Sequence, residues 1–575
     1  MSVASPLPRT KWLVSARNAE AEKRLSQELG VSPIVAALLV QRDLGDPAVA
    51  EVFLRASLDD LHDPALLPDY RPAVDAILAA RDSGDLIFVH GDYDVDGVTS
   101  AAIFDRFLRK IGCKVKTHVP HRMKEGYGIH SSAVEAAIAD GAKIFLTCDC
   151  GSSALEQIKT ARAAGMIVIV TDHHTIGEEW PQAHAFINVH RPDSTYPFKE
   201  LSGAGVVFKL CAGITKELGY PLSAFYRAYL DLASLGTVAD VMPLLGENRI
   251  IAKHGFLEIA QTKKQGLRAL KTVAEVDPTK PIRNYHIGFV LGPRLNATGR
   301  IDDAAISLQL LLEQDETKAM ALAQQVEKLN KDRKAEQDKI IEEAIAQCEA
   351  TMVDGQWVVV AVQDGWHAGI VGIVASRLVE TFGRPAFVLT RDPLTGIIKG
   401  SARSIANFNL ADAIRANDSL FLSGGGHAMA AGCSFHESQY DNIVRALNGY
   451  AHEVLLEEDL VPSKRVDLEI APGELTLRTL EDLSRMEPFG VANPEPVFIS
   501  RNTKIIQLKP CKNPLHMSMT LRAGAEPAVR AIAFGLGEQL AEFAAGDEMD
   551  IIFKPDINEW NGSRSLQWKV LDYVA

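Results

Sequence analysis

The spacing of hydrophobic and polar positions changes several times along this chain of 575 residues. Over residues 1–80, apolar residues recur at helical spacing, as in AEAEKRLSQELG and VSPIVAALLVQ, which predicts a helical region. The next stretch instead holds short, continuous apolar runs separated by helical segments: LIFVH (86–90), KIFLTCD (143–149), IVIVTDHH (167–174) and FINVH (186–190). Continuous apolar strands that alternate with helices predict a parallel sheet covered by helices on both faces.

A mostly helical pattern follows over residues 202–275. Residues 303–350 contain neither Gly nor Pro and are rich in Ala, Leu, Gln, Glu and Lys, which predicts one long helix with Asp302 or Asp303 near its N-terminal cap. The part from Thr317 to Cys348 alone would span about 48 Å at the helical rise per residue. Because such a helix is longer than one small domain, we expect it to connect two parts of the chain.

The alternation of apolar runs and helices then returns: WVVVAV (357–362), a helix over 369–382, AFVLT (386–390) and IIKGSARS (397–404). From about 463 to 575, apolar and polar residues alternate between turn signals, which predicts an antiparallel β domain. The predicted fold class is therefore α/β, with two α/β units joined by a long helix and followed by a β domain.

Composition restricts the class of protein. The chain is 47% hydrophobic and 23% charged, as expected of a globular protein. No run approaches the roughly 18 apolar residues that span a bilayer, and the first residues lack the apolar segment of a secretory signal. Seven cysteines are too few for a disulfide framework and suit a reducing compartment. We therefore expect a cytoplasmic protein without a membrane anchor.

The net charge is −14, but two stretches run against it. Residues Arg106–Lys124 hold seven cations and residues Arg501–Arg522 hold five, with no acid in either stretch. Charge runs are usually solvated faces. Distribution matters more than the sum, so the balance argues neither for nor against nucleic acid.

The acidic segment VHGDYDVDG (89–97) has the highest density of potential metal-ligating side chains in the chain. Asp92, Asp94 and Asp96 occupy every second position, and carboxylates so close together repel one another unless a cation neutralises them. This predicts a metal site, the alternative being a solvated acidic turn. The spacing also resembles a calcium-binding EF-hand loop, but a strand precedes it and Ile103 stands where a bidentate Glu is required.

Further acids and histidines lie where other predicted strands end. Asp149 ends one apolar run, Asp172, His173 and His174 end the next, and Asp240 stands in the apolar stretch LASLGTVADVMPL. Ligands of α/β sheets bind at the carboxyl ends of the strands, so these groups should converge on one site. Such a carboxylate-rich set favours Mn²⁺ or Mg²⁺. Cys148 and Cys150 could suggest zinc, but no second cysteine pair lies near them in the sequence.

The ordered motifs DYDVDG, CDCG, DHH and GTVADV resemble those of the DHH phosphoesterase superfamily. The similarity continues through PHRMKEGYGIH (120–130), GPRLNATGR (292–300), GWHAGIVGIVASRL (365–378), GSARS (400–404) and SGGGHAMAAG (423–432). Together these motifs are similar to those of the RecJ family of bacterial single-strand-specific 5′→3′ DNA exonucleases. The resemblance covers the chain from about residue 35 to residue 575.

This resemblance implies a division of the chain into five segments. They are an N-terminal helical region (1–80), a DHH domain (81–300), a connecting long helix (301–350), a DHH-associated domain (351–455) and an OB-fold-like barrel that binds single-stranded DNA (463–575). OB-folds hold single strands with basic grooves and stacking aromatic residues, and the basic stretch Arg501–Arg522 falls inside the last segment.

The resemblance also implies a site for two divalent ions, Mn²⁺ or Mg²⁺. One ion would be held by His90, Asp94 and Asp149, and the other by Asp96, Asp149, His173 and Asp240, with Asp149 bridging. Asp92 would ligate an ion or support the ligands, and His174 would contact the scissile phosphate. The expected catalytic residues are accordingly Asp94, Asp96, Asp149 and His174.

Phosphate or DNA binding is expected from GSARS, GGGH and GPRLNATGR. Glycines let a backbone approach phosphate closely, and an arginine fork matches phosphate oxygens, although a Gly-rich segment is often only a tight turn. The expected residues are Ser401, Arg403, Ser404, Gly425, Gly426, His427, Arg294, Asn296 and Arg300.

The implied function is a single-stranded-DNA exonuclease that releases 5′-mononucleotides in recombination and repair, with single-strand-binding protein and a RecQ-type helicase as partners. One alternative is a DHH phosphodiesterase that acts on short oligoribonucleotides or cyclic dinucleotides. Another is a non-catalytic Cdc45-like scaffold. The N-terminal helices and the OB-like domain argue against the first alternative, and the complete set of acids and histidines argues against the second.

Overall fold

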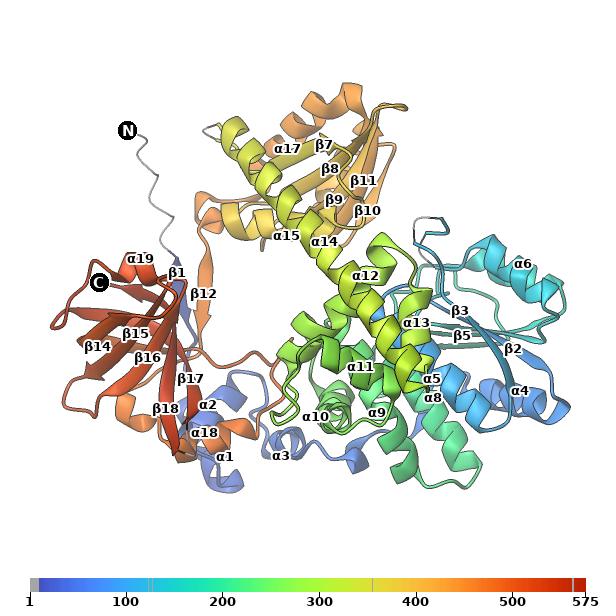
Figure 1. Cartoon of the computed structure of the whole chain (residues 1–575), viewed down its shortest axis with the longest axis horizontal. Coiled ribbons are helices and arrows are strands. Elements are labelled where there is room, and N and C mark those ends of the chain that lie inside the picture. The colour runs from blue at the N-terminus through green and yellow to red at the C-terminus, as the bar shows by residue number, and fades with distance from the viewer. Residues whose placement is uncertain (1–9, 123, 127, 354, 561–562) are drawn as a thin grey trace. The chain divides into compact units, whose positions relative to one another are not determined.

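The structure is a computed structural model that describes residues 10–122, 124–126, 128–353, 355–560 and 563–575 (Figure 1). Its contacts divide it into two compact units. The first is formed mainly by residues 294–303 and 323–464, and the second by residues 12–293, 304–322 and 465–575. Two residues of the motif at 120–130, Met123 and Tyr127, lie outside the described residues.

The second unit contains the predicted parallel sheet. Its order is β3 (Lys114–His118), β2 (Leu86–Gly91), β4 (Ile144–Cys148), β5 (Ile167–Asp172) and β6 (Ala185–Asn188), and every pairing is parallel. One face packs against α6 (Ser131–Ala139) and α7 (Leu155–Ala163), and the other against α4 (Tyr70–Ser83), α5 (Val95–Lys110) and α8 (Gly203–Glu217). Strand β3 was not predicted, because at the sheet edge its lysines alternate with apolar residues and hide the apolar run.

Helix α5 begins inside the acidic segment, at Val95. The Asp94 carboxylate accepts a hydrogen bond from Gly97 N–H at 2.9 Å and so caps the helix. Asp96 therefore lies in the first helical turn and not in a loop. The helical pattern over 202–275 is confirmed by α8, α9 (Leu222–Ala239), α10 (Gly246–Ala260) and α11 (Gln265–Val273).

The predicted single helix over 303–350 is two helices, α13 (Ala305–Leu312) and α14 (Glu316–Thr351). The break occurs because the Glu313 carboxylate accepts hydrogen bonds from the backbone N–H groups of Gln314 and Asp315. Helix α14 then continues for 36 residues without interruption (Figure 1). It starts in the second unit and passes into the first at residue 323, so it does connect two parts of the chain.

The first unit is a mixed sheet between helices. Its order is β10 (Ser423–Gly426), β11 (Ala430–His436), β9 (Ile397–Arg403), β8 (Ala386–Asp392) and β7 (Val359–Asp364), and only β7 and β8 are parallel. One face packs against α14 and α15 (Val371–Phe382), and the other against α16 (Leu410–Ala416) and α17 (Tyr440–Val454). The glycines of GGGH, for which a tight turn was the alternative to phosphate binding, form the edge strand β10.

The C-terminal β domain is a barrel within the second unit. Its strands run in the order β13 (Leu468–Glu469), β14 (Phe498–Pro510), β15 (His516–Ala523), β16 (Val529–Phe534), β18 (Ser563–Val574) and β17 (Glu548–Trp560). Pairing of β14 with β17 closes the barrel. The pairings β13–β14 and β16–β18 are parallel, so the domain is not wholly antiparallel. Two short helices complete it, α18 (Leu477–Ser484) and α19 (Gly537–Leu540).

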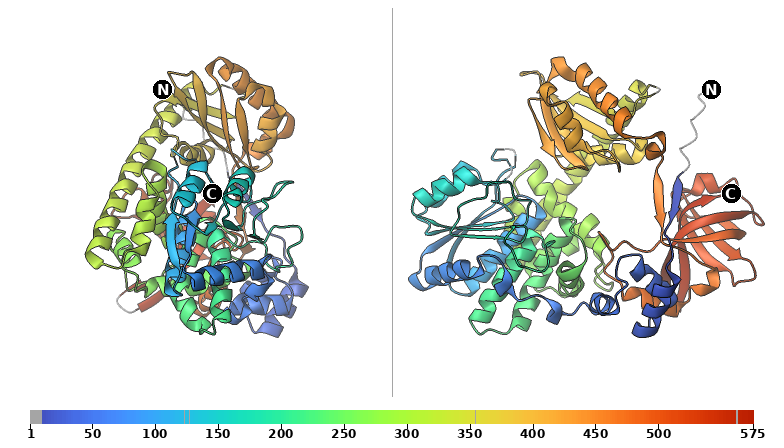
Figure 2. Two further views of the ribbon diagram at one scale, coloured as in Figure 1. Left: turned by 90° about the vertical axis from the view of Figure 1, so that its right-hand side faces the viewer. Right: turned by 180° about the vertical axis from the view of Figure 1, so that it is seen from behind.

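The N-terminal helices share the hydrophobic core of this barrel. Buried residues of α1 (Ala19–Leu29), α2 (Pro33–Val40) and α3 (Pro47–Arg55) belong to the same cluster as barrel residues such as Phe498 and Trp568. Figure 2 shows these helices beside the barrel. Before them, β1 (Lys11–Val14) pairs with β12 (Ser463–Val466), which places a strand in the region predicted to be helical. Across the described ranges, no helix combines the length and apolar character needed to cross a membrane.

Candidate metal centre

Five aspartates and His173 meet at the carboxyl edge of the parallel sheet. Their ligand atoms, together with one from His174, fall into groups with members within 4.8 Å of one another: Asp92, Asp94 and Asp149; Asp96, His173 and Asp240; and Asp149, His173 and His174. The residues come from the ends of β2, β4 and β5, from the start of α5, and from the C-terminal cap of α9. The expected convergence of strand ends is therefore present.

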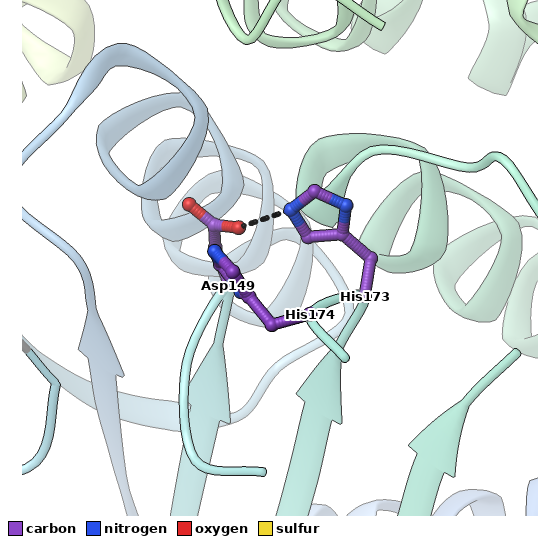
Figure 3. A group of neighbouring side chains, drawn as sticks. All are labelled: Asp149, His173 and His174. Atoms are coloured by element: carbon purple, nitrogen blue, oxygen red, sulfur yellow. Dashed lines mark ion pairs between the residues drawn. The ribbon is translucent and has the colours of Figure 1, made fainter. Parts of the chain in front are cut away.

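His173 lies at the middle of the cluster. Its Nε2 atom is 3.1 Å from Asp149 Oδ1, 3.6 Å from Asp240 Oδ2 and 3.8 Å from Asp96 Oδ2. Figure 3 shows the ring turned toward the Asp149 carboxylate. Burial, followed by the neighbouring His174, lowers the pKa of His173 to about 4, so the ring is neutral and offers a lone pair.

Two glycines that sequence reasoning passed over allow the carboxylates to sit so close. A Cβ on Gly203 would come 2.5 Å from Asp149 Oδ1, and a Cβ on Gly236 would overlap Asp96 Oδ1. Asp149 itself has a φ of 62°, in the left-handed region that Asp tolerates better than most residues. The only sequence signals were small residues in the segments SGAGV and SLGTVAD.

The N-terminus of α8 supports Asp96. Gly203 N–H and Ala204 N–H donate to the two oxygens of this carboxylate at 2.6 and 2.9 Å. The positive end of the helix dipole favours a negative charge there. Asp96 therefore connects the start of α5 with the start of α8, a role that its position in DYDVDG did not indicate.

The electrostatics of the cluster favour bound cations. Among the described residues, none of the five aspartates forms an ion pair with Lys or Arg. Burial, and then the neighbouring carboxylates, raise the pKa of Asp92 and Asp240 to about 8 and that of Asp96 to about 7, and raise the pKa of Asp149 well above its usual value. Such a set is held in its ionised form only if positive charge is supplied.

Several ligand atoms of the cluster lack hydrogen-bond partners. Asp92 Oδ1, Asp149 Oδ1 and His173 Nε2 are buried, and no described residue forms a hydrogen bond with any of them. Buried polar atoms are nearly always paired, so unpaired ones that face each other mark a place suited to a bound cation. Carboxylate oxygens together with one imidazole suit Mn²⁺ or Mg²⁺, and the donor set therefore fits the expected divalent ions.

His90, predicted as a ligand, is not in these groups. It is fully buried within the acidic segment, its Nε2 atom lies 3.3 Å from Gly128 O, and no described residue forms a hydrogen bond with its Nδ1 atom. Burial lowers its pKa to about 4, which leaves the ring neutral. Asp92 is thus the residue whose ligand atom lies within 4.8 Å of those of Asp94 and Asp149, and the role of His90 as a ligand stays a prediction.

Asp172 is a residue whose role sequence reasoning left out. It is buried and accepts hydrogen bonds from the backbone N–H groups of Ser152 and His173, while its Oδ1 atom lies 2.7 Å from His174 Nδ1. Burial opposes charge on His174, but the hydrogen bond and charge of Asp172 outweigh it and raise the pKa of His174 to about 9. The same pairing keeps the pKa of Asp172 below its usual value despite its burial.

The two cysteines that flank Asp149 are not arranged as zinc ligands. Cys148 and Cys150 are buried, and burial raises the pKa of both thiols well above the usual value. Zinc binds the thiolate form. Neither cysteine belongs to the groups of potential ligands found among the described residues.

In the first unit, Ser401 and Arg403 lie at the N-terminus of α15. A Cβ on Gly372 would be 3.2 Å from Arg403 Nη2 and 3.4 Å from Ser401 Oγ. Nearby, Arg300 Nη1 donates to Gly369 O at 2.9 Å. The described ion pairs do not include Arg403, whose guanidinium donates to Ala402 O, and burial lowers its pKa. An arginine, a hydroxyl and a helix N-terminus together form a surface suited to an anion.

The other predicted phosphate-binding residues divide into two groups. Gly425, Gly426 and His427 are exposed, and Gly425 pairs with Gly432, which in turn pairs with Ser401 across the sheet. Two residues are instead used inside the chain: the Ser404 hydroxyl donates to Phe408 O at 2.6 Å, and Arg294 Nε donates to Glu327 at 2.6 Å. Asn296 is half-buried on α12 (Gly292–Ile301).

The two basic stretches also differ. In the first, Arg106 donates to Leu311 O and Leu312 O, Arg109 pairs with Asp105, and Lys116 pairs with Asp140. Much of the positive charge of this stretch is therefore neutralised or hydrogen-bonded by other residues of the chain. In the second, Arg501 pairs with Asp550, but the remaining cations Lys504, Lys509, Lys512 and Arg522 are exposed and enter none of the described ion pairs.

Comparison with known proteins agrees with this geometry. Family models match residues 86–237 (DHH family, N-terminal domain), 354–453 (DHHA1 domain) and 466–572 (RecJ OB domain). The single-stranded-DNA-specific exonuclease RecJ of Bacillus subtilis is 36% identical over 98% of this chain and 70% of its own length. That of Escherichia coli is 36% identical over 86% of this chain and 88% of its own length.

A solved structure of RecJ in complex with Mn²⁺ from Thermus thermophilus superposes with a TM-score of 0.84 at 28% identity, and covers 99% of this chain and 80% of that one. A second structure of RecJ from the same organism is in complex with Mg²⁺ and gives a TM-score of 0.77, covering 98% of this chain and 78% of that one.

The parallel sheet, the mixed sheet and the acidic cluster define a protein of the DHH class. With the barrel included, the chain belongs to the RecJ family of single-stranded-DNA-specific exonucleases.

Proposed function

We propose that this chain is a single-stranded-DNA-specific 5′→3′ exonuclease that hydrolyses phosphodiester bonds, releases 5′-mononucleotides and acts in DNA recombination and repair. The observation that carries this proposal is the cluster of five aspartates and His173, most of them buried and several with unpartnered ligand atoms, in a chain of the RecJ family. The complete set of ligands argues against a non-catalytic scaffold.

The cofactors would be two divalent ions, Mn²⁺ or Mg²⁺. Asp92, Asp94 and Asp149 would hold one ion, and Asp96, His173 and Asp240 would hold the other together with Asp149. His90 remains a candidate ligand of the first ion, because its ring is neutral and Nδ1 is unpartnered. When bound, such ions supply Lewis-acid stabilisation of the phosphate and lower the pKa of bound water.

The chain's own contribution to the reacting phosphate would come from His174. With a pKa of about 9, its ring is protonated at neutral pH. Because Nδ1 is held by Asp172, the Nε2 N–H can donate to a non-bridging phosphate oxygen. The fixed pair orients this donor before the substrate binds, which lowers the cost of reorganisation in the transition state.

A second phosphate would be bound in the first unit. Arg300, Ser401 and Arg403, with the N-terminus of α15, would bind the 5′-terminal phosphate and so determine which end of the strand is degraded. Gly425, Gly426 and His427 on the neighbouring edge strand would bind the adjoining backbone. Asn296 remains a candidate contact, whereas Ser404 and Arg294 would support the fold.

The barrel would hold the strand. Lys504 pairs across the sheet with Arg522, and Lys509 and Arg530 lie exposed on the same series of strands. Phe534 is 53% exposed and meets the ring of His516 edge-on at 5.1 Å. Cations for the backbone and rings for the bases are what single-strand binding requires.

The chain would be organised as the five segments expected from its sequence, with the barrel and the N-terminal helices acting as one body because they share a core. All seven cysteines are free, which supports the proposal of a reducing cytoplasm. Single-strand-binding protein and a RecQ-type helicase are proposed as partners from the family resemblance.

One assay tests this function. Oligonucleotides of DNA and RNA, single and double, labelled at the 5′ or the 3′ end, are incubated with Mn²⁺, Mg²⁺ or EDTA. We expect mononucleotides from the 5′ end of single-stranded DNA only, no reaction in EDTA, and no reaction for Asp149→Ala with retained strand binding. Cleavage restricted to short oligoribonucleotides or cyclic dinucleotides, or none by the parent, would overturn the proposal.

A further inference from the structure

Two large aromatic side chains stand exposed and stacked on each other on the surface of the second unit. Tyr285 is 62% exposed and Phe289 is 72% exposed, and their ring centroids are 5.6 Å apart with an interplanar angle of 21°. Single exposed apolar residues are common, but a contiguous exposed apolar surface usually marks an interaction site.

The pair is presented by a firmly anchored segment. The π-helical turn η3 (His286–Leu291) carries Phe289 and begins next to Tyr285. Ile287 and Leu291 of this turn are fully buried, and Arg283 N–H donates to His286 Nδ1 at 2.9 Å. The two rings are therefore held in place by packing of the opposite side of the turn, and π-helical turns are frequent at functional sites.

One end of this segment adjoins the metal cluster. Turn η3 packs against α9, and a Cβ on Gly292, the residue after η3, would lie 3.5 Å from Ala239 Cβ. Ala239 immediately precedes Asp240, which belongs to the cluster. Val241 follows, with its side chain 64% exposed. The segment that carries the aromatic pair is thus followed by a residue that contacts the neighbour of Asp240, a predicted metal ligand.

The other end adjoins the segment that enters the barrel. A Cβ on Gly490 would lie 3.3 Å from Asn284 Oδ1, next to Tyr285. Val491 accepts a hydrogen bond from Leu244 N–H at 2.8 Å and is itself 42% exposed. Residues 490–491 lead into β14 at Phe498. Exposed apolar side chains therefore extend from the cluster toward the barrel within one compact unit.

We propose that Tyr285 and Phe289 form a base-stacking platform for the part of a single strand between the barrel and the metal centre. This inference rests on the proposed function. Every nucleobase has a π face, so stacking holds a strand without reading its sequence. Arg283 is exposed beside the pair and enters none of the described ion pairs, which leaves a cation for the backbone. That charge favours a nucleic acid over an apolar protein partner.

The test uses 5′-phosphorylated single strands that carry one 2-aminopurine at successive positions. Binding is measured by fluorescence in EDTA, where no cleavage is expected. In the parent, stacking should quench 2-aminopurine at one or two adjacent positions. In Phe289→Ala and Tyr285→Ala, that quenching should be lost and binding should weaken by roughly 5- to 150-fold. Phe289→Trp should preserve both signals.

The matched control is Tyr220→Ala. Tyr220 is 59% exposed and precedes α9, at the end opposite Asp240, so its loss should change neither signal. The strand supplies a second control: on an oligonucleotide that is abasic at the quenched position, Phe289→Ala and the parent should bind equally. Equal weakening on normal and abasic strands would show a packing role and overturn the platform, as would unchanged binding and quenching in both alanine variants.

The two proposals fail in different ways. If the parent neither binds nor degrades single-stranded DNA, the proposed function is wrong. If the parent does both and no position is quenched, the function stands and the platform is wrong.

Discussion

The Nδ1 atom of His174 lies 2.7 Å from Oδ1 of Asp172, the residue two positions before it. Asp172 is buried and also binds the backbone N–H groups of Ser152 and His173. This carboxylate is outside the groups of potential metal ligands, so its effect on the reaction passes through His174. We therefore expect Asp172 to act as a positioning residue for His174, whose pKa of about 9 keeps its ring charged at neutral pH.

The first prediction concerns the pH dependence that this pair creates. In the parent, His174 is protonated below a pKa of about 9, so activity should fall as the pH rises through that value. Asp172→Asn removes the charge that raises the pKa, while burial continues to lower it. The alkaline limb of the kcat/KM profile should then move toward neutral pH, with a loss of 10- to 100-fold at pH 8, on the order of one charged hydrogen bond.

His174→Ala should remove the alkaline limb altogether and lower the rate at every pH. Asp193→Asn, which changes an exposed acid paired with Arg191, should leave the profile in place. An unshifted alkaline limb in Asp172→Asn would mean that the pair does not govern the reaction.

The second prediction concerns the stability of the metal-free protein. The pKa of Asp92 in the folded state, about 8, is above its ordinary value, so folding favours the neutral acid. This stabilisation of the folded state is complete below the pKa that Asp92 has in the unfolded protein. It is lost as the pH rises through the pKa that Asp92 has in the folded protein. In EDTA, the Tm should therefore fall between pH 5 and pH 8, and Mn²⁺ should restore it.

Asp92→Asn is neutral at every pH, so its Tm in EDTA should fall less. At pH 8 in EDTA, the free energy of unfolding of the variant should exceed that of the parent. The difference should be on the order of 1 kcal/mol for each pH unit between the unfolded and the folded pKa of Asp92. Asp82→Asn, at an exposed acid on α4, serves as the control. A parent Tm in EDTA that rises with pH would contradict the assignment of this cluster as mutually repelling acids.

The third prediction tests the close packing around the carboxylates. A Cβ on Gly236 would overlap Asp96 Oδ1 and the Ala204 side chain lies nearby, so Gly236→Ala should displace the Asp96 carboxylate. We expect metal affinity and cleavage to fall at least 10-fold while the protein still folds. Isothermal titration with Mn²⁺ measures the first quantity.

The control is Gly449→Ala, which also changes a helical glycine to alanine. Nothing lies within 4 Å of a Cβ there, so the substitution should stabilise α17 by up to about 1 kcal/mol and leave activity unchanged. Normal metal affinity in Gly236→Ala would show that the cluster tolerates the displacement.

The fourth prediction concerns Arg403. Its loss should lower kcat/KM by about 10- to 150-fold on strands with a 5′-phosphate, the value of one charge-assisted contact made in the transition state. On strands with a 5′-hydroxyl the loss should be much smaller. Arg403→Lys should recover only part of the activity, because an ammonium lacks the planar fork.

Arg391→Ala is the matched variant, because this arginine lies on β8 of the same sheet but pairs with Asp364 at 2.6 Å. Arg391→Ala should show the same ratio of kcat/KM on 5′-phosphate and 5′-hydroxyl strands as the parent. Equal losses on both substrates in Arg403→Ala, together with a lower Tm, would assign Arg403 to the fold instead.

The fifth prediction concerns the barrel. Deleting residues from 463 onward would uncover the apolar faces of α1–α3, and it would remove the Met486 carbonyl that accepts from the buried Arg249 guanidinium at 2.8 Å. Charge reversal is therefore the cleaner test. Lys504→Glu combined with Arg522→Glu should raise the KM on long strands and leave kcat nearly unchanged.

The salt dependence gives an independent readout, because each lost phosphate contact on a single strand reduces the slope of log K against log salt by about 0.7. Lys159→Glu, at an exposed lysine on α7, controls for net charge. An unchanged KM and slope would remove the barrel face from the DNA-binding surface.

The sequence by itself determined most of the elements and the order in which the site residues occur along the chain. Continuous apolar runs predicted the parallel sheet, and the placement of Asp149 and His173 after such runs predicted their convergence, because parallel strands deliver their carboxyl ends to one edge. The absence of Gly and Pro predicted a long helix. These features depend on residues close together in the chain, where periodicity and local chemistry carry the information.

Tertiary structure alone decided how distant segments complete the site. Asp96 is held by the N–H groups of Gly203 and Ala204, more than a hundred residues away, and no local pattern contains that pairing. Strand β3 was hidden because its alternating lysines match an edge and not a buried strand. The N-terminal helices proved to share a core with the barrel at the far end of the chain, because apolar faces with no nearby partner are buried wherever the fold brings them together.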